Sequence, residues 1–205
     1  MEAGRGTQYG DGLLEIKKQN LHNKHELICV APTFSHLPWY ADHPTDATIR
    51  QESYLLHVVV PFVARTYPTR TDGAGRLLLG FSKSGWGAWS LLLRHPDRFG
   101  RAAAWDAPLA KARPDQFGMP EIFATQPNFQ QYEITRLLRD RAPLLHPKPR
   151  LLLLGYDNFR SHHETIHALL TELQIPHEYR DGPQRQHRWD SGWLNEAVEL
   201  LVQSP

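Results

Sequence analysis

The hydrophobic positions of the chain form short apolar runs that alternate with longer amphipathic stretches. Short continuous apolar runs are typical of buried strands, whereas apolar residues that recur every three or four positions indicate helices. The runs predict strands at residues 26–30, 76–81, 101–105, 150–154 and 177–180. The amphipathic stretches predict helices at residues 13–24, 48–66, 85–94, 161–173 and 189–202, and Pro61 is expected to kink the second of them.

Strands that alternate with helices, and that are apolar along their whole length, are typical of a parallel sheet with helices on both faces. We therefore predict one α/β domain over residues 1–205, with a mostly parallel sheet flanked by helices. Residues 107–149 interrupt the alternation, because they are polar and proline-rich, and we interpret them as a helical excursion. In such sheets, sites form outside the carboxyl ends of the strands.

The composition and charge narrow the possible functions. The chain has 205 residues, of which 40% are hydrophobic and 22% charged, and its net charge is +1. No basic stripe suggests nucleic-acid binding, and no apolar run approaches the roughly 18 residues that span a bilayer. The N-terminus does not have the pattern of a signal peptide, so we expect a cytoplasmic protein. Cys29 is the only cysteine, and we expect it to pack in the core.

The stretch GFSKSGWGAW at residues 80–89 follows an apolar run directly. A strand, a serine at the turn and then a helix form the layout of a nucleophile elbow, whose usual pattern is G-x-S-x-G. The elbow brings the strand and helix backbones close together, so the positions two before and two after the nucleophile must be small. Gly80 and Ser84 meet this requirement around Ser82. We predict Ser82 as the nucleophile and interpret Ser84, in place of glycine, as tolerated.

Other reactive side chains follow the other predicted strands. Asp106 follows the strand at residues 101–105, Asp157 follows the strand at 150–154, and His187 comes after the last strand. The order Ser, acid, His along the chain is that of α/β-hydrolases, and it differs from the orders in chymotrypsin and subtilisin.

The chain resembles the esterase group of α/β-hydrolases, the branch that includes esterase D, feruloyl esterase and mycolyltransferase-like proteins. The matching segments are GFSKSGWGA (80–88), HPDRFG (95–100), GYDNF (155–159) and HRWDSGW (187–193). The resemblance implies an ester hydrolase that acts on a small-molecule ester without a cofactor. It implies Ser82 as nucleophile, His187 as base and Asp157 as the acid that orients the base.

The identity of the acid has an alternative, because Asp106 could orient His187 from the neighbouring strand. We favour Asp157, since the acid usually follows the strand before the histidine loop, and Asp106 could instead be a turn residue before Pro108. The backbone N–H of Lys83, the residue after the nucleophile, is the predicted oxyanion donor.

Residues 163–167, HETIH, match the zinc motif H-E-x-x-H. His163 and His167 would bind the metal, and Glu178 or His187 would have to supply a third ligand. We do not favour this zinc hydrolase alternative. The histidines open an ordinary helix whose other side is apolar, and we expect them to be solvated. A second alternative is a relative that keeps the fold without catalysis.

Two further expectations concern the substrate side of the site. The loop at residues 37–44, LPWYADHP, could line a substrate groove with Trp39, Tyr40 and Asp42, and Trp86 flanks the nucleophile. The second oxyanion donor normally comes from a loop after an earlier strand. We expect either that the chain lacks its N-terminal strands or that the strand at 26–30 and the loop at 31–38 take their place.

Overall fold

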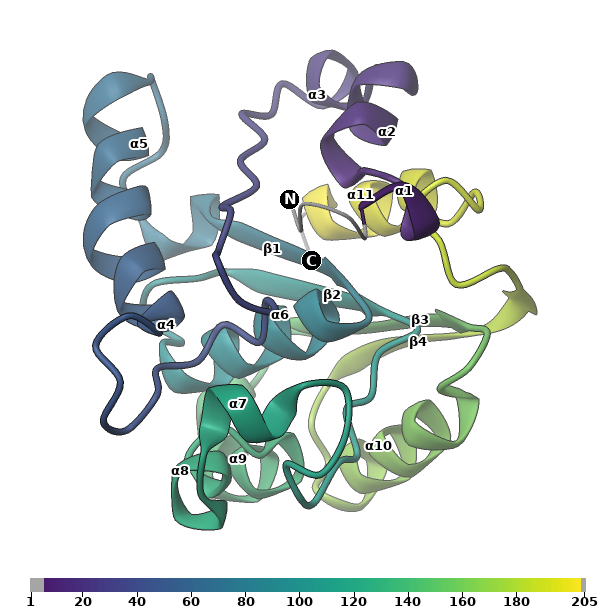
Figure 1. Ribbon diagram of the computed structural model, residues 1–205. Helices are drawn as coiled ribbons and strands as arrows, with labels where there is room; N and C mark the ends of the chain where they lie inside the picture. Colours follow the sequence, from purple (N-terminus) through teal and green to yellow (C-terminus); the bar gives the residue numbers. More distant parts are fainter. Residues whose placement is uncertain (1–5, 204–205) are drawn as a thin grey trace.

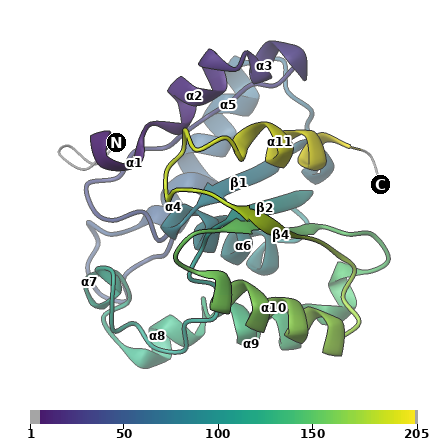
Figure 2. The same ribbon diagram turned by 90° about the vertical axis from the view of Figure 1, so that its right-hand side faces the viewer.

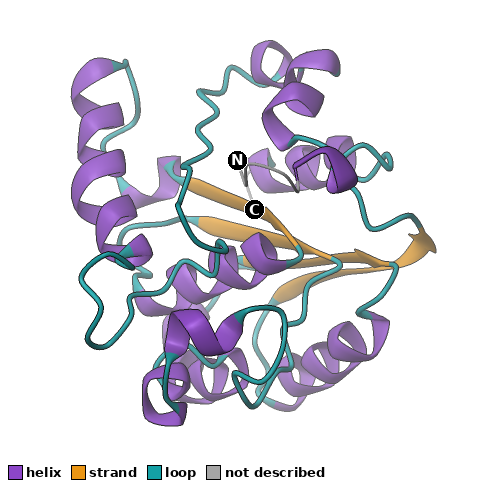
Figure 3. Ribbon diagram, in the orientation of Figure 1, coloured by secondary structure: helices purple, strands orange, loops and turns teal. Residues whose placement is uncertain are grey.

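The computed structural model describes residues 6–203, and within this range the chain folds around one four-stranded sheet (Figures 1 and 3). The strands are all parallel and lie side by side in chain order. They are β1 (Leu77–Phe81), β2 (Arg101–Trp105), β3 (Leu151–Tyr156) and β4 (His177–Gln184). The predicted α/β class with a parallel sheet is therefore confirmed, and these strands correspond to the last four predicted from the sequence.

The helical elements lie before, between and after the strands. Before β1 lie α1 (Gly6–Tyr9), α2 (Gly12–Lys18), α3 (Leu21–Lys24), α4 (Gln51–Tyr54), the π-helical turn η1 (Leu55–Val59), α5 (Val60–Thr66) and the 3₁₀ turn η2 (Gly73–Gly75). After β1 lie α6 (Lys83–Arg94), α7 (Met119–Phe123), α8 (Gln126–Gln130), α9 (Ile134–Arg141), the 3₁₀ turn η3 (Ala142–Leu145), α10 (Arg160–Glu172) and α11 (Leu194–Val202).

Helices cover both faces of the sheet (Figure 2). On one face α6 packs against β1 and β2, and α10 packs against β3, whereas α11 covers the other face. Each face has its own apolar cluster: Trp86 and Trp89 belong to the cluster under α6, and Trp105 and Trp193 to the cluster under α11. All five residues of β2 are buried, as expected for a strand covered from both sides.

The strand predicted at residues 26–30 is wrong. The chain between α3 and α4 is a loop (Figure 3), apart from an isolated bridge between Asp42 and Arg50. Ile28 and Val30 are 44% and 47% exposed, and Cys29, expected in the core, is partly exposed. An apolar run forms a strand only where a neighbouring strand accepts it, and among the described residues none pairs with the outer edge of β1.

The first two predicted helices also differ in detail. The helix expected at residues 13–24 is divided into α2 and α3, because Asn20 adopts a left-handed conformation with φ of 54°. The helix expected at 48–66 runs from α4 through η1 to α5. Its π-helical turn lies just before Pro61, where the missing N–H and the crowding of the preceding turn by the ring disturb regular α-helical bonding.

The segment at residues 107–149, interpreted from the sequence as a helical excursion, contains α7, α8, α9 and η3. No helix within residues 6–203 is both long enough and apolar enough to cross a membrane.

Candidate active site

Ser82 lies at the sharp turn between β1 and α6. Its φ of 56° and ψ of −121° are a combination that residues with a side chain seldom adopt. Three backbone hydrogen bonds hold the turn: Ser82 N donates to Trp105 O at 3.1 Å, and Ser82 O accepts from Gly85 N at 3.0 Å and Trp86 N at 3.2 Å. The strained backbone is thus fixed by both β2 and α6, and it places the serine at the carboxyl end of the sheet.

The close approach that the elbow requires is present at Gly80. A Cβ atom added there would lie 2.0 Å from the carbonyl oxygen of Ser84, which is far inside van der Waals contact. Only glycine therefore fits two residues before Ser82, as the steric argument from the sequence predicts.

His187 connects Ser82 to a carboxylate. Its Nε2 lies 3.1 Å from the hydroxyl of Ser82, and its Nδ1 lies 2.5 Å from Oδ2 of Asp106. Aromatic rings surround the imidazole, with the ring of Phe81 at a centroid distance of 4.3 Å and that of Tyr9 at 5.5 Å. The three side chains form one hydrogen-bonded series across the ends of β1, β2 and β4.

Asp106 is fully buried directly after β2, with a φ of 39°. Its two carboxylate oxygens accept hydrogen bonds from Phe159 N at 2.8 Å and Asn158 N at 3.1 Å. Burial alone would raise the pKa of this carboxyl, but the hydrogen bonds from His187 and from the backbone outweigh it and hold the pKa below its usual range. Asp106 is therefore an ionised partner for His187.

The preference for Asp157 over Asp106 as the partner of the imidazole is corrected by this geometry. The Asp157 carboxylate accepts from the backbone N of His187 at 2.8 Å and from Gln184 Nε2 at 3.2 Å. Asp157 thus binds the backbone of the histidine loop. The turn after β3 donates its backbone N–H groups to Asp106. Asp106, directly after β2, is the carboxylate that contacts the ring.

The histidines that open α10 fix the loop that carries Asp106. Nε2 of His163 accepts from Ala107 N, and Nδ1 of His162 accepts from Ala110 N, each at 3.0 Å. The expectation that these histidines are solvated is wrong for His163, which is 2% exposed. Burial lowers its pKa to about 4, so the ring is neutral near pH 7.

The HETIH motif is not assembled as a metal site. The Nε2 atom of His163 is occupied by the Ala107 N–H, and His167 Nδ1 pairs with His177 Nε2 at 2.8 Å. Among residues 6–203, no three His, Cys, Asp or Glu side chains are arranged to hold a metal ion. The donor geometry therefore does not support the zinc alternative.

Of the four residues predicted to contact substrate, only Tyr40 lines the groove beside Ser82. Trp39 and Trp86 are completely buried and meet edge to face, so the expectation that they line the groove is wrong. Asp42 is also a structural residue, because its carboxylate accepts from the backbone N and the hydroxyl of Ser53. Aromatic residues are as suitable for a core as for a groove, and the sequence does not distinguish these uses.

The groove has a volume of about 1040 Å³ and borders Ser82, Lys83 and His187. Most of its wall is apolar. It includes Leu77, Leu79 and Phe81 of β1, Leu27, Ile28 and Val30 of the N-terminal loop, Val198 and Leu201 of α11, and the rings of Phe117, Phe159 and Trp189. The loop at residues 31–38 also contributes to it. The sequence did not identify any residue of α11, or of the N-terminal segment before residue 31, as part of this groove.

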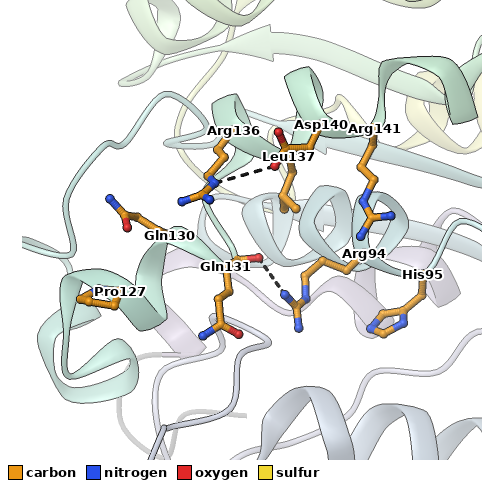
Figure 4. Close-up of a pocket in the computed structure, with 9 residues that line it drawn as sticks. All are labelled: Arg94, His95, Pro127, Gln130, Gln131, Arg136, Leu137, Asp140 and Arg141. Carbon is orange, nitrogen blue, oxygen red and sulfur yellow. Dashed lines mark hydrogen bonds and ion pairs between the residues drawn. The ribbon is translucent and has the colours of Figure 1, made fainter.

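A smaller pocket, of about 430 Å³, lies at the other end of α6 (Figure 4). Two of its arginine side chains are engaged: Arg94 bonds to Gln131 O at 2.7 Å and to the carboxylate of Glu52, and Arg136 pairs with Asp140 at 3.7 Å. Burial would raise the pKa of Glu52, but His95 and Arg94 hold it at about 2. This pocket surrounds an ion-pair network and has none of the residues of the Ser82 series.

The parallel sheet, the strained serine between β1 and α6, and the histidine after the last strand define the α/β-hydrolase class. The family described as "Putative esterase" matches residues 37–145, a little over half of the 205-residue chain. The chain therefore belongs to this esterase family, as the sequence motifs suggested.

Solved structures agree with the fold. A serine hydrolase of Staphylococcus aureus, fluorophosphonate-binding serine hydrolase F, is similar with a TM-score of 0.78 at 18% identity, over 94% of this chain and 78% of its own. MPT51 (FbpC1) of Mycobacterium tuberculosis has a TM-score of 0.73 at 15% identity, over 95% and 83%. An S-formylglutathione hydrolase of Agrobacterium tumefaciens has a TM-score of 0.60 at 17% identity, over 80% and 62%.

None of the curated protein sequences matches this chain. The chain spans less than two thirds of the Agrobacterium hydrolase, and about four fifths of the two structures with higher TM-scores. Together, the family and these neighbours place the chain among the esterase-like hydrolases.

Proposed function

We propose that this protein hydrolyses carboxylic esters through an acyl-enzyme intermediate, with Ser82, His187 and Asp106 as the catalytic triad. The observation that carries the proposal is the continuous hydrogen-bonded series from the Ser82 hydroxyl through the imidazole of His187 to Asp106. A serine hydroxyl is a weak nucleophile until an imidazole takes its proton.

In the first half of the reaction, Ser82 Oγ attacks the carbonyl carbon of the ester while Nε2 of His187 accepts the hydroxyl proton. The ionised Asp106 holds the Nδ1–H tautomer and stabilises the imidazolium. The tetrahedral intermediate then expels the alcohol, which takes the proton from Nε2, and leaves the acyl group on Ser82. In the second half, water gives a proton to Nε2 and attacks the acyl carbon; this second intermediate then breaks its bond to Ser82 Oγ, which takes the proton back from Nε2 as the acid is released.

The oxyanion of each tetrahedral intermediate needs hydrogen-bond donors. We assign one to the backbone N–H of Lys83, the first residue of α6, since the residue after the nucleophile supplies this donor in the α/β-hydrolase elbow. The positive end of the α6 dipole favours negative charge at the same place.

The substrate we propose is a small-molecule ester with an apolar portion. The support is the apolar wall of the groove at Ser82, where Phe81 and Leu79 continue from the elbow along β1. A predominantly apolar cleft with a few polar groups at one end is the usual form of a small-molecule site.

A fluorophosphonate probe tests the proposal directly. We expect the wild-type protein to be labelled covalently and Ser82→Ala not to be labelled, and p-nitrophenyl ester hydrolysis to follow the same pattern. Ser90→Ala is the matched control, because the Ser90 hydroxyl is buried without a hydrogen-bond partner. A folded wild-type protein that neither reacts with the probe nor hydrolyses esters would identify a non-catalytic relative instead.

A further inference from the structure

Ser84 stands where the elbow pattern has glycine, and its hydroxyl has a defined position. Ser84 Oγ donates a hydrogen bond to Phe81 O at 2.8 Å and accepts one from Phe81 N at 3.0 Å. One hydroxyl can both donate and accept. The Ser84 side chain therefore occupies both backbone polar groups of the residue directly before the nucleophile.

These two groups of Phe81 are the ones that point away from the sheet. Ser82 N bonds to Trp105 O of β2, and in a parallel ladder alternate residues bond to the same neighbour. Phe81 consequently directs its N–H and C=O to the outer edge of β1. In the described part of the chain β1 is an edge strand, so no further strand occupies these groups.

We propose that Ser84 is a positioning residue. Its hydroxyl makes the two hydrogen bonds to Phe81 that a neighbouring strand would otherwise make, and it thereby holds the end of β1 in the conformation of the elbow. The inference rests on the proposed function for its effect on catalysis, but its structural part stands on the hydrogen bonds alone. Ser84 is then a functional replacement for glycine, beyond the tolerated change that the sequence suggests.

Phe81 connects Ser84 to the reacting groups, Ser82 and His187, in two ways. Its backbone leads directly into the strained Ser82, and its ring lies 4.3 Å from the imidazole of His187, centroid to centroid. Phe81 also packs against Trp105 and Trp189, at centroid distances of 5.4 Å and 5.5 Å. A shift of the Phe81 backbone would therefore move both the nucleophile and one wall of the histidine site.

Loss of the hydroxyl leaves two polar groups without their partner. Phe81 is 5% exposed, so water would have to enter the end of β1 to replace the hydroxyl. Leaving a buried backbone group unpaired costs more than the net value of the bond that is lost. The glycine that restores the usual motif is thus expected to weaken this particular elbow.

The decisive experiment compares Ser84→Gly, Ser84→Ala and Ser84→Thr with the wild-type protein. Hydrogen exchange at the Phe81 amide, followed by NMR, measures directly how well the hydrogen bond from Phe81 N to Ser84 Oγ protects this amide. We expect exchange at least tenfold faster in the glycine and alanine variants and near wild type in the threonine variant, which keeps the hydroxyl. The net value of one hydrogen bond sets this order, roughly tenfold.

The second measurement is the rate of fluorophosphonate labelling. We expect roughly tenfold slower labelling for Ser84→Gly and Ser84→Ala, a lower kcat with KM little changed, and recovery with Ser84→Thr. Ser90→Ala controls for loss of a buried hydroxyl as such and should be unaffected.

If the Phe81 amide exchanges and the probe reacts at wild-type rates in all the Ser84 variants, the inference is overturned. Equal defects in the threonine and alanine variants would also overturn it, because the hydroxyl would then not be the active part. If the wild-type protein is not labelled, the proposed function fails, and the exchange of the Phe81 amide still decides the role of Ser84.

Discussion

Oδ2 of Asp106 lies 2.5 Å from Nδ1 of His187, although 81 residues separate them along the chain. The contact exists because β2 places Asp106 at the carboxyl end of the sheet, where the segment after β4 returns with the histidine. Asp106 and Asp157 both follow apolar runs in the sequence, but only Asp106 makes this contact, and variants of the two residues can test the difference.

Replacing Asp106 should be far more damaging to catalysis than replacing Asp157. Asp106→Asn removes the charge that holds the Nδ1–H tautomer and stabilises the imidazolium, so we expect kcat to fall by roughly 10³–10⁴-fold. Asp157→Asn removes an acceptor from the backbone of the histidine loop, and we expect a loss of less than about tenfold. Hydrolysis of p-nitrophenyl acetate by the two variants provides the comparison. Similar losses in both would contradict the assignment of Asp106.

The histidines of α10 should support the acid loop without a metal. His163→Phe removes the acceptor for Ala107 N, one residue from Asp106, and should lower kcat by roughly tenfold or more. His167→Phe is the matched control on the same helix, because His167 contacts His177 and Tyr179 instead. The zinc alternative makes the opposite prediction: both variants and a chelator would then abolish activity. Steady-state kinetics with and without chelator separate these outcomes.

The stability of the protein should decrease as the pH falls from about 6.5 to 4. Burial holds the pKa of His163 at about 4 in the folded protein, against an ordinary value of 6.5; His162 acts in the same direction, and the Asp106 carboxylate opposes it. Above pH 6.5 the imidazole is neutral in both states. Between these values only the unfolded chain takes up the proton, so unfolding is favoured, by about 3 kcal/mol in total.

Urea unfolding of the wild-type protein and His163→Gln at pH 7 and pH 4.5 measures this effect. Glutamine has an acceptor oxygen for Ala107 N–H but does not titrate in this range. The variant should therefore lose less stability between the two pH values than the wild type. An identical loss in both proteins would show that other groups cause the acid sensitivity.

Gly80→Ala should prevent the elbow from forming normally. The new Cβ would lie 2.0 Å from Ser84 O, a backbone atom that cannot move without disturbing the first turn of α6. We expect a loss of stability of about 3 kcal/mol or more, typical of overpacking at a site that cannot relax, together with loss of fluorophosphonate labelling. Gly12→Ala is a milder comparison, because its Cβ would meet the Trp189 ring at 3.0 Å. Thermal unfolding of both variants is the measurement, and equal stability would contradict the steric argument.

Local patterns explain the parts of the molecule that the sequence predicted correctly. The apolar runs of β2 and β3 are buried on both faces, whereas β1 is buried only at its carboxyl end, and such continuous runs have few other interpretations. The run at residues 26–30 is apolar in the same way, but it can form a strand only if another strand is available to pair with it. Periodicity carries no information on that point.

Three of the four residues predicted to contact substrate do not line the groove, for a related reason. Trp39 lies in the predicted loop and Trp86 in the elbow motif, but both rings pack in the core beneath α6. Conversely, α11 and the N-terminal segment contribute to the groove although nothing in their composition marks them. Which side of a loop or helix faces a cavity is decided by packing between distant segments.

By itself, the sequence determined the α/β class, the elbow around Ser82, and the pairing of this serine with His187 in the order of an α/β-hydrolase. These features depend on spacing and residue size within short segments, which are readable along the chain. Only the tertiary structure decided between Asp106 and Asp157, and gave the hydroxyl of Ser84 its two partners on Phe81. Both outcomes depend on distances of about 3 Å between atoms, set where the ends of separate strands and helices meet.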